Sequence, residues 1–130
     1  MRIIQANLRA FDWWNAKDNV VFIRILKQLQ KITRYPVLGF NLFDEDYAWR
    51  FAYGSKGLMR PIVKILISLE GLAEEKDPRC ITSDMLLTAW EELPTEDRHS
   101  EENPFELESM PPQWKPADSR KGERDRNGGK

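Results

Sequence analysis

The stretch Tyr53-Gly54-Ser55-Lys56-Gly57-Leu58-Met59-Arg60 separates two apolar segments and decides how they can be arranged. Gly54 is expected to end the preceding helix, because glycine readily takes the left-handed conformation found after a helix. Gly57 permits close approach of backbone or a ligand, and Arg60 stands at the start of the next helix. Such a turn directs backbone donors and a cation to one spot, which suits an anionic ligand. The alternative interpretation is a plain turn with a solvated arginine.

The composition limits the chain to one small domain with residues to spare as a tail. It has 130 residues, of which 41% are hydrophobic, and most of these precede Leu93. The formal net charge of −1 gives no global electrostatic argument for nucleic-acid binding. Cys80 is the one cysteine and His99 the one histidine. These counts exclude an internal disulfide and a cysteine zinc site, and argue against a Ser-His-Asp triad or a multi-histidine metal site.

Residues 1–20 bear on the compartment of the protein. They carry five charged residues and no continuous apolar segment, so they resemble neither a signal peptide nor a membrane span. A single cysteine fits a reducing compartment. The sequence therefore predicts a cytoplasmic protein without membrane contact.

Hydrophobic periodicity predicts a mainly α fold, a small bundle of about four helices. The first helix is expected over 19–33, with Asp18 as its N-cap. Its apolar stripe is expected to consist of Val21, Ile25, Leu29 and Ile32, widened by Phe22 and Leu26. The second is expected over 42–53 after Asn41, with acids at 44–46 that favour its macrodipole. Adjacent residues on a helix point apart, so these acids are not expected to bind a metal ion.

The third helix is expected to open at Ser55 or Arg60 and to end near residue 75, before Pro78. It carries the densest apolar face of the chain, so its central residues Ile65 and Leu69 are expected to be among the most buried. The fourth helix is expected from the N-cap Thr82 to about residue 93.

Three segments are expected along the chain: a strand or linker segment at 1–17, a helical domain at 18–93, and a flexible, disordered tail at 94–130. The possible strand is the short run at 2–4, which has no partner strand in this sequence. The tail is rich in proline and charge and lacks the apolar residues that offset ordering entropy. Phe105 and Trp114 interrupt its polarity and predict partner-binding motifs, with chance aromatics in a linker as the alternative.

The series of features resembles the lid subdomain of AAA+ ATPases, most closely the transposon target-selection ATPases of the TnsC/TniB group. The pattern Gly57-Leu58-Met59-Arg60 matches the G-x-x-R of the family's sensor 2 arginine, and 81–86 resemble its closing "I-T" helix. In this resemblance, 2–4 correspond to the last strand of the nucleotide-binding core, and 11–14 to its link into the lid. Pro61 departs from the pattern and predicts a later helix start.

The resemblance implies a lid that contacts ATP through Arg60, Gly57 and Ser55, packs on an AAA+ core domain, and recruits a transposase or targeting protein through its tail. DNA would be reached through the assembly. No G-x-x-x-x-G-K-[ST] phosphate loop occurs in these 130 residues, and the Walker B acid is also missing. The chain is therefore not expected to be an enzyme alone, nor to bind a metal.

Two other classes of function stay open. One is a small all-helical subunit of a nucleoprotein complex, such as a CRISPR effector, binding nucleic acid non-specifically through Arg24, Lys27 and Lys31. The aromatic cluster at 11–14 could stack bases, although packing on the core is the simpler interpretation. The other is an independent enzyme, which the lack of a convergent acid–base set disfavours.

Overall fold

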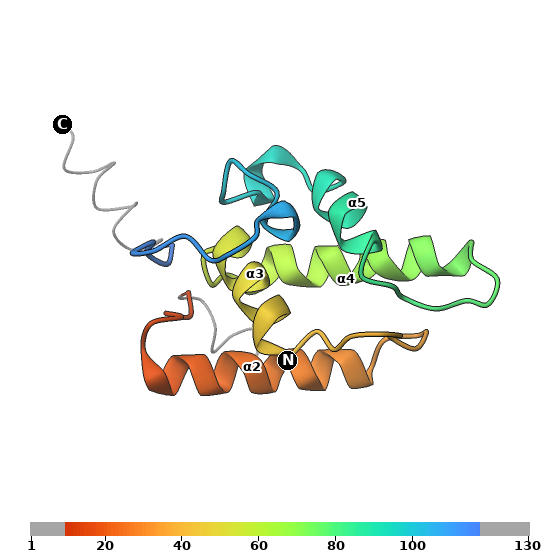
Figure 1. Ribbon diagram of the computed structural model, residues 1–130, viewed down its shortest axis with the longest axis horizontal. Coiled ribbons are helices and arrows are strands. Elements are labelled where there is room, and N and C mark those ends of the chain that lie inside the picture. The colour runs from red at the N-terminus through yellow and green to blue at the C-terminus, as the bar shows by residue number, and fades with distance from the viewer. Residues whose placement is uncertain (1–9, 118–130) are drawn as a thin grey trace.

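The computed structural model describes residues 10–117 and confirms the mainly helical fold (Figure 1). These residues form four α-helices, α2 (Ala16–Lys31), α3 (Glu45–Ser55), α4 (Met59–Glu74) and α5 (Met85–Glu91), and two 3₁₀ turns, η1 (Thr95–Asp97) and η2 (Pro104–Glu106). Within the described part there is no strand, only an isolated parallel bridge between Val37 and Ile81. The possible strand at 2–4 lies outside the described residues.

The helices are arranged around α3. It packs against both α2 and α4, while α5 lies on α4 and η2 contacts both α3 and α5. Figure 1 shows α2 along one edge of the molecule and α5 beyond α4 on the other side. Among the described residues, no helix combines the length and apolar character needed to cross a membrane.

Helix α2 begins three residues before the expected position. Asn15 is its N-cap, and the Asn15 side chain accepts hydrogen bonds from the backbone of Lys17 and Asp18. Asp18 instead accepts from the backbone N–H of Asp12. The expected stripe is also rotated: Phe22 and Leu26 are buried, but Val21 and Ile32, expected on the core side, are exposed.

Helix α3 starts at Glu45 after Asp44, and the expectation of a start at 42 is wrong. Asn41 and Asp44 form a local turn, in which the Asn41 N–H donates to the Asp44 carboxylate at 3.0 Å. This turn lets Leu42 enter the core, where it is fully buried. The local polar pairing and the burial of Leu42 therefore take precedence over an earlier helix start.

Helix α5 also starts late, at Met85, because Thr82 donates its hydroxyl to the Asp84 carboxylate. The loop before it is tied to the loop before α3: Leu38 N–H donates to Ile81 O at 2.9 Å, and Ile81 N–H donates to Pro36 O at 2.8 Å. This pairing places Ile81 in the core.

The core lies between α3, α4 and α5, with one face of α2 closing it. Ile65 and Leu69 are 2% and 0% exposed, which confirms their expected burial. The largest fully buried apolar side chains come from all four helices and their connections: Phe22, Leu26, Leu42, Phe51, Ile62, Ile65, Leu69, Ile81 and Leu86.

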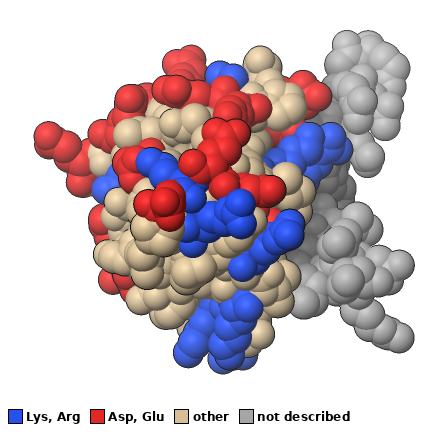
Figure 2. All heavy atoms as spheres, turned by 90° about the vertical axis from the view of Figure 1, so that its right-hand side faces the viewer, with Lys and Arg blue, Asp and Glu red and all other residues tan. Residues whose placement is uncertain are grey.

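The C-terminal segment, residues 94–117, packs on the helices, and the flexible tail expected from residue 94 needs correction over this range. Trp114, Asn103 and Asp97 are all buried. The amide of Ala117 donates to Lys56 O at 2.8 Å, so the packing continues to the last described residue. The remainder of the expected tail, 118–130, lies outside the described residues. Figure 2 shows one group of Lys and Arg at the lower edge, on the side where α2 lies, and others interleaved with Asp and Glu across the middle and upper part.

Leu69→Ala is expected to lower the free energy of unfolding by about 2–5 kcal/mol, because it removes a fully buried side chain from a packed helix face. Ile67→Ala on the same helix is the matched control. Ile67 is 64% exposed, so its loss should be within about 0.5 kcal/mol. Urea unfolding of both variants checks this, and a loss below about 1 kcal/mol at Leu69 would contradict the packing.

Candidate functional site

The α3–α4 turn is tightened by left-handed residues and by hydrogen bonds within the turn. Lys56 and Gly57 both take positive φ angles, of 51° and 86°. The Gly57 N–H donates to Ala52 O at 3.0 Å and to the Ser55 hydroxyl at 3.1 Å. Ser55 is 1% exposed. The Gly57 N–H and the Ser55 hydroxyl are therefore used within the turn, and do not face a ligand.

Gly54 does not end α3 as expected, whereas Gly57 permits the close approach expected of it and also takes the left-handed conformation expected at Gly54. Gly54 lies inside α3, and a Cβ there would come within 2.7 Å of the Trp90 ring and 2.8 Å of Pro104. Gly57 is the left-handed glycine, and a Cβ there would lie 2.0 Å from Phe11 O. The Phe11 N–H donates to Gly57 O at 3.0 Å. The close approach that Gly57 permits is therefore to the chain's own N-terminal backbone.

Arg60 occupies the first turn of α4, as expected, and its side chain is 69% exposed. Arg60 has a carboxylate partner, contrary to the alternative of a solvated arginine: its Nε lies 3.3 Å from Asp97 Oδ1. Lys64 Nζ lies 2.7 Å from the other carboxylate oxygen. The Asp97 side chain is only 5% exposed, so both cations neutralise a nearly buried charge.

Pro61 does not delay the helix. Helix α4 begins at Met59, and Pro61 falls in its first turn, where backbone N–H groups have no intrahelical acceptor. The proline ring is buried. The proline therefore leaves Arg60 on the helix, one residue after its start.

An aromatic cluster holds the end of the C-terminal segment beside this turn. Lys56 Nζ lies 3.6 Å from the centre of the Tyr53 ring and 5.5 Å from that of Trp114. Trp14 donates its indole N–H to Trp114 O at 2.8 Å. Trp14 and Trp114 are thus in contact although they lie 100 positions apart in the sequence. This contact favours packing over base stacking for the pair.

Burial shifts several ionisable groups around this cluster. It lowers the pKa of Lys56, with Glu102 opposing the shift. It raises the pKa of Tyr53, whose hydroxyl donates to Glu102 at 2.9 Å. Burial also lowers the pKa of His99; Asp97 opposes this shift and Lys56 adds to it.

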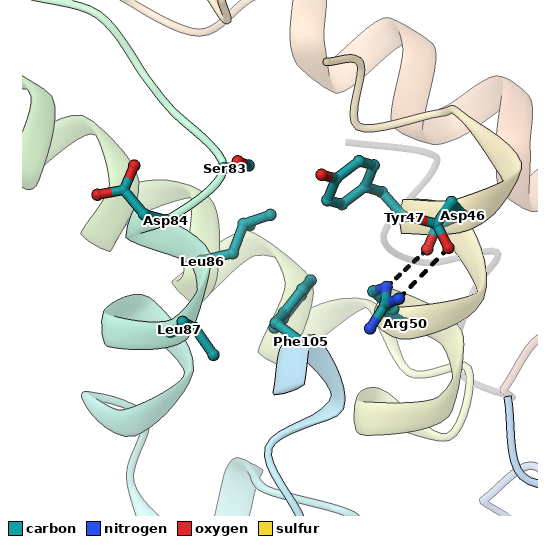
Figure 3. Close-up of a pocket in the computed structure, with 8 residues that line it drawn as sticks. All are labelled: Asp46, Tyr47, Arg50, Ser83, Asp84, Leu86, Leu87 and Phe105. Carbon is teal, nitrogen blue, oxygen red and sulfur yellow. Dashed lines mark hydrogen bonds and ion pairs between the residues drawn. The ribbon is translucent and has the colours of Figure 1, made fainter. Parts of the chain in front are cut away.

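A second feature is the hollow between α3, α5 and η2, with a volume of about 230 Å³ (Figure 3). Arg50 lines it, but each of the three guanidinium nitrogens already donates a hydrogen bond. Arg50 donates to Pro104 O at 2.9 Å and to Leu107 O, and its Nε donates to Asp46 O. Phe105 lies on the hollow's wall and stacks edge-on against Phe51, with ring centres 5.2 Å apart. Arg50 thus fixes the C-terminal segment and is not free for a ligand.

The expected partner-binding residues Phe105 and Trp114 therefore contact the bundle itself. Trp114 is 8% exposed, and its indole N–H is buried without a hydrogen-bond partner in the described structure. An unpaired buried donor costs about 1–3 kcal/mol. The C-terminal segment is held in place, but Trp114, one of the residues that hold it, has an unpaired N–H.

Chemically, the α3–α4 region offers charge recognition. In the described part of the chain, no three His, Cys, Asp or Glu residues are grouped to hold a metal ion. Arg60 is the cation at the turn that combines exposure with a fixed backbone. The sequence alone did not indicate the roles of Asp97, Lys64 and Arg50. Their contacts between the helices and the C-terminal segment span more than 30 positions, and the local pair of Arg50 with Asp46 gives no sign of them. The sequence does contain one signal that the C-terminal segment is ordered. Asn103 followed by Pro104 is a cap with proline at the first position of a 3₁₀ turn.

Gly57→Ala is expected to destabilise the fold more than Gly39→Ala, although both glycines have φ of 86°. Gly39 has open space around it, so its substitution costs only the left-handed strain, about 1–2 kcal/mol. At Gly57 the clash with the Phe11 backbone should add about 1–3 kcal/mol. Chemical denaturation measures both, and equal losses would show that the approach to Phe11 is unimportant.

The protonation of His99 is expected to oppose folding. Its folded-state pKa lies below the ordinary 6.5, so the unfolded chain binds the proton first as the pH falls. Stability should therefore drop as the pH falls below 6.5, and this contribution should be absent in His99→Gln. Unfolding curves of both proteins across this range test it; parallel pH dependences would contradict the assignment.

The comparisons with known proteins identify no family. No family model matches the chain, and no solved structure matches it. A dihydroorotase from Saccharolobus solfataricus is 35% identical over 46 residues, which cover 35% of this chain and 12% of that protein. The chain therefore spans only a small part of that relative's length, and the similarity does not place it in a family.

Proposed function

We propose that this chain is the helical lid region of an AAA+ ATP-binding transposition regulator, acting in the cytoplasm. In this role Arg60 binds the phosphates of an ATP molecule held by a core domain on another polypeptide or another part of the same protein. The chain supplies the sensor arginine and a partner-binding segment, and the core supplies the phosphate loop.

The observation that carries the proposal is the placement of Arg60. It stands on the first turn of α4, whose inner face is buried, with its side chain 69% exposed and only Nε engaged by an ion pair with a described residue. The turn before it is fixed by the hydrogen bonds of Gly57. A guanidinium held this way keeps donors available for the two-bond grip that phosphate favours.

Asp97 supports the proposal because its charge is shared. When Arg60 turns to a phosphate, Asp97 keeps Lys64, which is the closer partner at 2.7 Å. The buried carboxylate is therefore not left unpaired, which would be strongly destabilising. In this interpretation Ser55 and Gly57 do not touch the nucleotide; they position Arg60 by fixing the turn.

The C-terminal segment is the proposed contact for a transposase or targeting protein. Phe105 and Trp114 anchor it in the isolated chain, and the unpaired Trp114 indole N–H weakens one anchor. A partner protein that accepts a hydrogen bond from this N–H would bind the segment in competition with the helices. Releasing the segment from the helices would then cost less free energy, because no satisfied hydrogen bond of this N–H is lost.

The test requires the missing core. A phosphate-loop polypeptide should be encoded in frame upstream or beside this chain, and the two should assemble in an ATP-dependent way. Arg60→Ala should weaken that assembly by about 1.5–3 kcal/mol, or roughly 10- to 150-fold, because one charge-assisted contact is lost. Analytical ultracentrifugation with and without ATP measures the effect.

Lys56→Ala is the matched control, since it removes a cation from the same turn whose ammonium lies over the Tyr53 ring. It should leave the ATP dependence nearly unchanged. Equal effects of Arg60→Ala and Lys56→Ala, or a genomic neighbourhood without a phosphate loop, would contradict the proposal. Thermal unfolding of each variant separates loss of assembly from loss of fold.

A further inference from the structure

The outer face of α2 carries a regular line of cations. Lys17, Arg24 and Lys31 recur every seven residues, and Lys27 lies beside them; all four are exposed. At 1.5 Å per residue the line is about 21 Å long, with about 10 Å between its three main members. Residues seven apart lie on nearly the same side of a helix, so these charges face outward together.

These cations are not neutralised by the described part of the protein. Elsewhere Arg50, Arg60 and Lys64 each form an ion pair, but none of the four α2 cations does so with a described residue. Lys27 lies over the Phe43 ring at 5.6 Å, which leaves its charge in place. The one acid on α2, Asp18, lies in the first turn and accepts the Asp12 N–H.

The charge of the chain is therefore unevenly distributed. The whole chain has a formal net charge of −1, although α2 itself is clearly positive. In Figure 2, one group of Lys and Arg stands at the lower edge, which is the α2 side in Figure 1, without Asp or Glu beside it, whereas cations and acids are interleaved across the middle and upper part. A separated basic face attracts polyanions even when the total charge is near zero.

We propose that this face of α2 binds the phosphate backbone of double-stranded DNA without reading its sequence. A line of outward cations matches a regular array of phosphates, and such contacts carry affinity without base specificity. Single-strand binders combine cations with exposed aromatic platforms. The outward face of α2 has none: its other exposed members are Ala16, Val20, Val21 and Gln28, and the Phe43 ring lies under Lys27. Trp14, half exposed before the helix, is held by Trp114.

The surface is independent of Arg60 and of any nucleotide, so its test differs from that of the proposed function. The full chain is titrated onto a fluorescently labelled DNA duplex of mixed sequence, and anisotropy is followed at several salt concentrations. We expect weak binding whose logarithm falls linearly with the logarithm of salt concentration. The double variant Arg24→Gln/Lys31→Gln should weaken binding and reduce the magnitude of the salt slope by about 2, one for each phosphate contact.

The matched control is Lys76→Gln/Lys115→Gln, which changes the net charge equally at exposed positions outside α2. It should retain most of the affinity, and neither double variant should lower the melting temperature. Equal losses from the two double variants would overturn the proposal, because binding would then follow net charge alone. Tighter binding to the single strand, or the absence of salt-dependent binding, would also overturn it; capture of an acidic protein without DNA binding would show a different partner.

Discussion

The close approach of the N-terminal backbone to the α3–α4 turn is the constraint on which the rest of the structure depends. Three amides from distant parts of the chain, those of Phe11, His99 and Ala117, donate to carbonyls within residues 54–57. The turn thus joins α3 to α4 and also collects both ends of the described chain. This arrangement requires that one residue of the turn has no side chain, and Gly57 meets that requirement.

Periodicity was sufficient to predict the helices and the centre of the core, but not the turn's partners. Ile65 and Leu69 could be predicted because they repeat on one helix face. The choice between Gly54 and Gly57 could not, because local sequence permits either to take a positive φ. The roles of the two glycines are decided by their neighbours: the Trp90 ring packs against Gly54, and the Phe11 backbone packs against Gly57. Both neighbours lie more than 30 positions away in the sequence.

The C-terminal segment shows why composition was misleading there. Its residues are mostly polar, which favours disorder when each is considered alone. A few of them nevertheless find specific partners: Arg50 binds two carbonyls of the segment, and Asp97 lies between two cations of α4. The same contact links the fold to the candidate site, because Asp97 is both an anchor of the segment and the partner of Arg60. A ligand that binds Arg60 therefore competes with Asp97, one of the residues that attach the C-terminal segment to α4.

The basic face of α2 has a different physical basis. Arg24, Lys27 and Lys31 are neighbours at spacings of three and four, and like charges at these spacings cost a helix about 0.2–0.5 kcal/mol per pair. Acids among them would stabilise α2, yet the helix has none beyond its first turn. The helix is instead held by Phe22 and Leu26 on its inner face and by the Asn15 cap. Its packing thus tolerates the repulsion on the outer face, and a polyanion bound there would relieve that repulsion.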